Sequence, residues 1–130
     1  DKTPFVIGFI ADQVPHWEAI DYWMEFFRQE TPVFTGTEKI ARRTGSAVFY
    51  MSLRKEKRGC YVATFHKISD MASTTEDYEL TKQYYKLLEE NITEHPELWL
   101  WTHRRWKRTK AKYQEWNERR IKRLKEKSQA

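Results

Sequence analysis

A carboxylate and an amide stand at a place in this 130-residue sequence where ligands are often bound. Asp12 and Gln13 directly follow the apolar run 5–11, whose continuous character predicts a buried strand. In open α/β sheets, ligands bind just beyond the carboxyl ends of the strands. The two side chains could therefore bind a sugar hydroxyl or position a catalytic loop. The alternative interpretation is that they cap a turn or a neighbouring helix.

Positive charges lie among tryptophans near the C-terminal end of the sequence. Arg104, Arg105 and Lys107 carry donors suited to a phosphate group. The aromatic rings beside them suit an interface between water and an apolar phase. We predict that these cations bind a phosphorylated lipid and that two of the three tryptophans pack in the core. The tryptophans are Trp99, Trp101 and Trp106.

The remaining candidates are less specific. Gly36 after Thr35 would allow a substrate to approach the backbone closely, or would simply form a tight turn. His103 is expected to form a local hydrogen bond, and the single Cys60 to be a small apolar strand residue. We expect no metal and no nucleotide cofactor. Cysteines and histidines show no zinc spacing, and the four glycines form no nucleotide-binding motif.

The elements that must position these groups follow from the apolar pattern and the turn residues. A strand is predicted at 5–11, a helix at 17–29 and a hairpin of strands at 47–53 and 60–68. Further helices are predicted at 38–43, capped by Thr37 and ended by Gly45, from Thr74 or Thr75 to Glu94 before Pro96, and from about Thr109 onward. The expected fold class is α/β, a partial mixed sheet of about three strands with flanking helices and a basic C-terminal helix.

Two features suggest that other protein surfaces complete the fold. A sheet of three strands leaves apolar faces and edges uncovered, so we expect either a homodimer or a missing N-terminal half. The sequence also begins without a methionine or a leader, which suggests a piece of a longer protein. The apolar run 5–11 is far shorter than the roughly 20 residues that span a bilayer.

The charge of the chain is concentrated at its C-terminal end. Residues 103–130 carry 12 Lys and Arg against 3 Asp and Glu, although the whole chain has a net charge of only +5. Such asymmetry indicates a polyanionic partner, which could be nucleic acid, an anionic membrane surface or a phosphorylated ligand.

Three blocks of the sequence decide among these partners. They are Gly8–Gln13 with its Ala-Asp-Gln end, Phe34–Ala41 with Thr44 and Gly45 after it, and the tryptophan-rich stretch His95–Lys107. In this order they resemble the lipid A biosynthesis acyltransferase family, within the lysophospholipid acyltransferase superfamily. The resemblance covers about residues 5–108 and corresponds to the C-terminal half of that family's catalytic region. It implies a domain part at 1–108 followed by a basic helical tail at 109–130.

The resemblance implies the transfer of a fatty acyl group from an acyl carrier protein thioester to a hydroxyl of a phosphorylated glucosamine lipid. In the family, a histidine acts as the general base, an acid five positions later orients it, and the pair lies upstream of the Ala-Asp-Gln strand. This chain has no such pair there, so we expect no catalytic residue in this fragment and no activity of the fragment alone. His16 and Asp21 have the spacing of this pair, but they lie after the Ala-Asp-Gln block and not before it. With 19 acids among 130 residues, one such pair among four histidines arises by chance about half the time.

The resemblance also implies partners and a location. We expect an acyl carrier protein, a phosphorylated glycolipid acceptor and an anionic membrane surface at the cytoplasmic face of a bacterial inner membrane. The alternative function is a non-enzymatic nucleic-acid-binding module that uses the basic aromatic tail. That alternative explains neither Asp12 and Gln13 nor the ordered match of three blocks, so no nucleic-acid partner is expected. A third possibility is a structural assembly domain that dimerises through its sheet edge.

Overall fold

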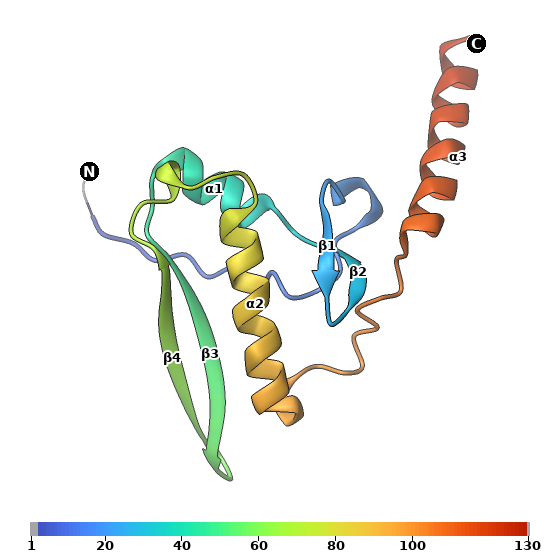
Figure 1. The fold of residues 1–130 in the computed structure, drawn as a ribbon. Helices are drawn as coiled ribbons and strands as arrows, with labels where there is room; N and C mark the ends of the chain where they lie inside the picture. Colours follow the sequence, from blue (N-terminus) through green and yellow to red (C-terminus); the bar gives the residue numbers. More distant parts are fainter. Residues whose placement is uncertain (1–2, 130) are drawn as a thin grey trace.

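The computed structural model describes residues 3–129, and its fold is built around one central helix (Figure 1). That helix, α2, spans Glu79–Glu94; the hairpin of β3 and β4 lies on one side of it and the hairpin of β1 and β2 on the other. The other elements are η1 (Trp17–Ala19), β1 (Trp23–Phe26), β2 (Gln29–Pro32), α1 (Gly36–Thr44), β3 (Val48–Lys57), β4 (Cys60–Ser69), η2 (Ala72–Thr74), η3 (Pro96–Leu98) and α3 (Lys110–Ser128). The α/β class is confirmed.

The strands form two separate antiparallel pairs, where the sequence predicted about three strands in one mixed sheet. β1 pairs with β2, with Phe26 opposite Gln29, and β3 pairs with β4, with Met51 opposite Phe65. Within residues 3–129 neither pair joins the other, because α2 lies between them. The β3–β4 hairpin itself is the one predicted from 47–53 and 60–68.

The predicted buried strand at 5–11 is wrong. Within the described residues the run forms no strand, and the side chains of Phe5, Val6 and Ile10 are 77%, 97% and 80% exposed. β3 and β4 pair only with each other in this part of the chain, so the run has no partner for its backbone. Only its last residue, Ala11, is buried.

The predicted helix at 17–29 is also wrong, because the chain turns back on itself at Phe27 and Arg28. Both residues have positive φ, 49° and 57°, as in the type I′ turns that join two-residue β-hairpins. The apolar residues Ile20, Trp23 and Phe27 imitate helical spacing, but the fully buried ring is that of Phe26. Asn-Gly or Asp-Gly usually marks such a turn, and neither is present here.

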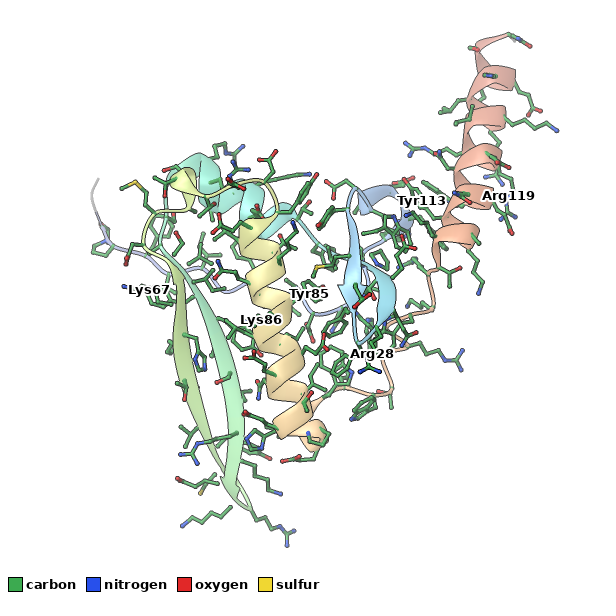
Figure 2. All side chains as sticks on the ribbon, viewed as in Figure 1. Arg28, Lys67, Tyr85, Lys86, Tyr113 and Arg119 are labelled. Carbon is green, nitrogen blue, oxygen red and sulfur yellow. The ribbon has the colours of Figure 1, made fainter. Side chains whose placement is uncertain are left out.

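We expect Arg28→Gly to raise the free energy of unfolding by about 1 kcal/mol. A residue with a Cβ atom is strained by roughly this amount at positive φ, and glycine is not. Arg28 lies at the exposed end of the β1–β2 hairpin (Figure 2), so no packing is lost. Urea unfolding measures the change. In a helix at 17–29 the same substitution would destabilise by about 1 kcal/mol, so the sign of the effect separates the two structures. Gln29→Gly, in a strand, serves as the control and should destabilise.

Helix α1 follows its sequence signals closely. Gly45 ends it at a φ of 65°, and its N–H donates to the carbonyls of Ala41 and Arg42, as a glycine at this position does. The predicted cap at Thr37 is wrong, since the helix already begins at Gly36 after Thr35.

Helix α2 begins later than predicted and ends where predicted. The chain first makes the short turn η2 and then passes through Tyr78, at a φ of 63°, before the helix starts at Glu79. Pro96 follows its end at Glu94. A buried carboxylate completes its first turn, because Glu38 of α1 accepts hydrogen bonds from the backbone N–H and the hydroxyl of Thr81.

The core lies between α2 and the two hairpins. Tyr85, whose side chain is 1% exposed, stands at its centre in contact with Phe26. The other buried members of this cluster are Val33, Tyr50, Leu88 and Ile92. Trp99 and Trp106 pack against the cluster while Trp101 is 61% exposed, which confirms that two of the three tryptophans are structural.

Helix α3 confirms the predicted basic helix and projects from the rest of the molecule (Figures 1 and 2). Thr109 caps it, with its hydroxyl oxygen accepting from the N–H of Lys112. Its first turns are anchored where Tyr113 and Trp116 stack on Trp17. No helix within residues 3–129 has the length and apolar character needed to cross a membrane.

Candidate functional site

A buried arginine ties the tryptophan-rich segment to the core. Arg105 is 3% exposed, and its Nη2 donates to the carbonyl of Pro32 at 2.8 Å and to the phenol oxygen of Tyr85 at 3.0 Å. The guanidinium also lies 5.8 Å from the centre of the Tyr85 ring. Arg105 therefore joins the segment after α2 to both α2 and the end of β2.

Tyr85 carries the connection on to the loop that holds Asp12. Its hydroxyl donates to the carbonyl of Ala11 at 2.8 Å, so one phenol oxygen accepts from Arg105 and donates to the residue before Asp12. Burial raises the pKa of Tyr85 and the negative charge of Asp12 raises it further, although Arg105 opposes both effects. The phenol thus stays protonated and keeps its proton available for Ala11.

Two more side chains of the same segment hold the loop and the hairpin. The indole Nε1 of Trp106 donates to the hydroxyl of Thr31 at 2.9 Å. Arg108 donates from Nη1 to the carbonyl of Pro15 at 2.6 Å and lies over the ring of Trp17. The segment 103–108 therefore contacts residues 14–17 and the β1–β2 hairpin directly and reaches Ala11 through Tyr85; we call this segment the clamp.

His103 takes part in this clamp through a long-range contact, which corrects the expectation of a local one. The backbone N–H of Val14 donates to Nε2 of His103 at 3.0 Å across 89 residues of sequence. Nε2 is thus the acceptor, and the ring proton sits on Nδ1. Burial lowers the pKa of His103, and the charges of Lys107 and Arg105 lower it further.

We expect this lowered pKa to make folding stability depend on pH below about 6.5, the ordinary value for histidine. Between that value and the lower folded pKa, the unfolded state binds more protons at His103 than the folded state does. The stabilising contribution is therefore complete above pH 6.5 and is lost as the pH falls toward the folded pKa. Thermal melts of the wild type and His103→Gln across this range should converge as the pH falls. Parallel curves would contradict the assignment.

A cavity of about 260 Å³ lies within the segment 99–107. Arg104 and Lys107, both exposed, stand at it together with the buried Arg105. The remaining lining residues are Trp99, Trp101, His103 and Trp106. No acidic residue is among the described residues that line it. The structure thus brings together the three cations that the sequence singled out, and the cavity has the composition of an anion site.

The tryptophan-rich clamp and the Ala-Asp-Gln loop that it holds lie within one sequence match. The family model of bacterial lipid A biosynthesis acyltransferases matches residues 2–108. The chain belongs to this family. The match confirms the resemblance found in the sequence and indicates a function of the lipid A biosynthesis acyltransferase type. No curated protein and no solved structure matches the chain significantly.

In this member of the acyltransferase family, the charge of Asp12 acts on the pKa values of three tyrosines and of His103. Burial raises the pKa of Tyr50 to about 12, and the charge of Asp12 adds to the rise. Burial and Asp12 likewise raise the pKa of Tyr84, and Asp12 opposes the fall in the pKa of His103. Asp12 and Gln13 are both half-buried, so a polar ligand can reach them.

The other predicted site residues lie at the start of α1 and not at the cavity. Thr35 is buried and donates its hydroxyl to Oδ1 of Asp21 at 2.8 Å, and Lys39 forms an ion pair with the same carboxylate. Gly36 is exposed, with open space where a side chain would be. Neither Thr35 nor Gly36 is among the described residues that line the 260 Å³ cavity.

The structure does not join His16 to Asp21. His16 is exposed and precedes η1, where its carbonyl accepts from the N–H of Ala19. The Asp21 carboxylate is occupied by Thr35 and Lys39, and no hydrogen bond or ion pair to His16 is found within residues 3–129. Asp21 therefore does not orient the ring of His16 in this structure, as the acid of a base–acid pair would.

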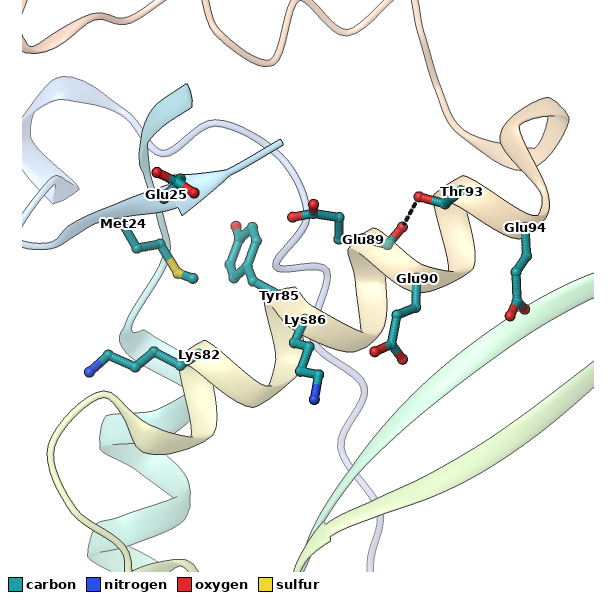
Figure 3. Close-up of a pocket in the computed structure, with 9 residues that line it drawn as sticks. All are labelled: Met24, Glu25, Lys82, Tyr85, Lys86, Glu89, Glu90, Thr93 and Glu94. Atoms are coloured by element: carbon teal, nitrogen blue, oxygen red, sulfur yellow. Dashed lines mark hydrogen bonds between the residues drawn. The ribbon is translucent and has the colours of Figure 1, made fainter. Parts of the chain in front are cut away.

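Sequence reasoning missed a second, larger cavity between β1 and α2, of about 480 Å³ (Figure 3). Lys82 and Lys86 reach it from the first half of α2, and glutamates reach it from the second half and from β1. The lining glutamates are Glu25, Glu89, Glu90 and Glu94. Glu89 also accepts from the backbone N–H of Phe27 at 3.1 Å, which fixes the β1–β2 turn. The spacing of the acids along α2 was the available signal.

Two further residues at functional positions carried no signal in the sequence. Tyr85 links Arg105 to the carbonyl of Ala11, the residue before Asp12. Glu38 is 5% exposed and holds the first turn of α2, with its Oε1 left unpartnered among the described residues. Both depend on partners at least 20 positions away in the chain.

Proposed function

We propose that this chain forms the acceptor-binding part of an enzyme that acylates a phosphorylated lipid A precursor. The donor is a fatty acyl thioester on acyl carrier protein. The acceptor hydroxyl attacks the thioester carbonyl, a C–O bond forms, the C–S bond breaks, and the hydroxyl proton passes through a general base to the departing thiol. The observation that carries this proposal is the clamp of residues 103–108, which holds the Ala-Asp-Gln loop beside a cavity of three cations.

In this proposal the general base comes from a part of the catalytic region upstream of the Ala-Asp-Gln loop. The arrangement of His16 supports this, since its ring is exposed and Asp21 is occupied by other groups. Asp12 and Gln13 bind sugar hydroxyls of the acceptor. At Thr35 and Gly36 the substrate approaches the backbone. The chain of 130 residues alone is inactive, and its tail 109–130 is a separate basic segment.

The working enzyme acts at the cytoplasmic face of a bacterial inner membrane. Its acceptor is a lipid, and α3 offers eight Lys and Arg against three Glu to the acidic carrier protein and to anionic lipid. The outer face of the β3–β4 hairpin contacts the upstream half of the catalytic region, or a second copy in the isolated chain. Phe49, Met51 and Phe65 on that face are about half exposed or more, which supports such a contact.

The test is transfer of a labelled acyl group from acyl carrier protein to a tetra-acylated, phosphorylated precursor by the full-length gene product. Asp12→Ala and Arg104→Ala should each lower the rate at least tenfold, whereas His16→Ala should leave it unchanged. The 130-residue chain alone should show no transfer. Activity of that chain, or loss of activity in His16→Ala, would show that the base lies within these residues.

The alternative function, nucleic-acid binding through the basic aromatic tail, is tested on the same full-length protein. If the full-length protein transfers no acyl group, binding of single-stranded DNA and RNA to α3 becomes the next measurement, with a steep salt dependence as its signature. A working acyltransferase that binds neither nucleic acid removes this alternative.

A further inference from the structure

The positive charge of Arg105 is buried without an anionic partner. Its Nε and Nη1 have no hydrogen-bond partner among the described residues, and both acceptors of Nη2 are neutral, the Pro32 carbonyl and the Tyr85 phenol. Burying a charge costs several kcal/mol unless an opposite charge and good hydrogen bonds offset it. A negative charge bound nearby would lower this cost.

The cavity beside Arg105 carries the sign needed for such a charge. Arg104 and Lys107 stand exposed at it, the buried Arg105 also lines it, and its other described lining residues are aromatic. The larger cavity at α2 has the opposite character, with four glutamates against two lysines. A concave site lined by one sign of charge concentrates ligands of the other sign. Anions are thus directed to the segment 99–107 rather than to the face of α2.

His103 adds a neutral donor to this cavity. Because Val14 donates to Nε2, the ring proton is on Nδ1, and no hydrogen bond to Nδ1 is found within residues 3–129. Its lowered pKa keeps the ring uncharged at neutral pH. The indole N–H of Trp101 already donates to the carbonyl of Pro96, so that ring offers its apolar face instead.

We propose that this cavity binds the phosphate monoester of the acceptor headgroup. Arg104 and Lys107 pair with the phosphate oxygens, and Nδ1 of His103 donates a hydrogen bond to one of these oxygens. The buried Arg105 adds a fixed positive charge next to the site. The assignment rests on the proposed function and deepens it. At about 260 Å³, the cavity is smaller than the roughly 300–1,000 Å³ that encloses a whole drug-sized ligand, so the acyl chains lie outside it.

Isothermal titration calorimetry of the 130-residue chain tests the assignment with three probes. N-acetylglucosamine 1-phosphate should bind at least tenfold more tightly than uncharged N-acetylglucosamine. Detergent micelles of the phosphorylated glycolipid should bind at least tenfold more tightly than micelles of the dephosphorylated lipid. Inorganic phosphate should bind more weakly than the sugar phosphate. If inorganic phosphate binds as tightly and the glycolipid does not, the site takes free phosphate and the assignment to the headgroup is wrong.

Matched variants separate this site from general attraction to a basic protein. Arg104→Ala and Lys107→Ala should each weaken binding of the sugar phosphate about tenfold. Arg123→Ala removes the same charge from the exposed face of α3 and should change binding less than twofold. Equal weakening in all three variants would overturn the proposal. So would tighter binding of a single-stranded DNA, a phosphate diester, that depends on Arg104 and Lys107.

The calorimetry does not depend on acyl transfer, so the two proposals fail separately. If the full-length enzyme transfers acyl groups while Arg104→Ala and Lys107→Ala bind the sugar phosphate normally, the site is wrong and the function stands. If transfer is absent while binding follows the variants as expected, the anion site stands and the function is wrong. Circular dichroism of each variant confirms that the fold is retained.

Discussion

Replacing Arg105 by alanine should lower the free energy of unfolding by about 2–4 kcal/mol, because two buried acceptors lose their donor. The Pro32 carbonyl and the Tyr85 phenol oxygen would each lose a hydrogen bond from a charged group. The buried stem of the side chain would also leave its packing position. Urea unfolding with an unchanged m-value measures the effect.

The matched control for Arg105→Ala is its neighbour. Arg104→Ala removes the same charge and the same side chain from an exposed position, and should change stability by less than about 0.5 kcal/mol. Similar losses at both positions would contradict the buried placement of Arg105. A stability gain in Arg105→Ala would show that the cost of its unpaired donors exceeds the value of its two hydrogen bonds.

Phe26→Ala should have the largest effect, a loss of about 3–5 kcal/mol, as for a phenylalanine removed from a closed core. Its ring is 1% exposed and lies 5.1 Å from the ring of Tyr85 and 6.0 Å from that of Trp106. The substitution would therefore leave a cavity between the β1–β2 hairpin, α2 and the tryptophan-rich segment.

The control for Phe26→Ala is the same substitution at Phe65, whose side chain is 67% exposed on β4. We expect that change to cost less than about 0.5 kcal/mol in the isolated chain. A large loss at Phe65 would indicate that the outer face of the β3–β4 hairpin is covered in solution. A small loss at Phe26 would contradict the core described here.

The tryptophan-rich segment of this family member has two roles, which are carried by different side chains. Trp106 and Arg105 face inward and hold Thr31, Pro32 and Tyr85. Arg104 and Lys107 face solvent at the cavity. Within four consecutive positions, two inward-facing residues lie between two solvent-facing ones, so a single block of sequence can both stabilise the fold and present charges to a ligand.

Local signals in the sequence were enough for the elements whose ends are set by neighbouring residues. Gly45 ends α1 and Pro96 follows α2 through backbone geometry, and Thr109 begins α3 through its side-chain hydroxyl, each within one turn of helix. The β3–β4 hairpin was also predicted, because its strands are rich in β-formers and close in sequence. The ordered motifs identified the family, and the family match confirmed it.

The sequence alone determined the α/β class, these local elements and the family, whereas the tertiary structure decided which residues meet. Ala11 meets Tyr85 across 74 positions, Pro32 meets Arg105 across 73 and Val14 meets His103 across 89. The periodic pattern of apolar residues does not indicate which distant residues will pair. The run 5–11 and the segment 17–29 were mispredicted for the same reason. An apolar pattern states that side chains favour burial, but the partner that buries them, or its absence, is fixed only when distant parts of the chain pack together.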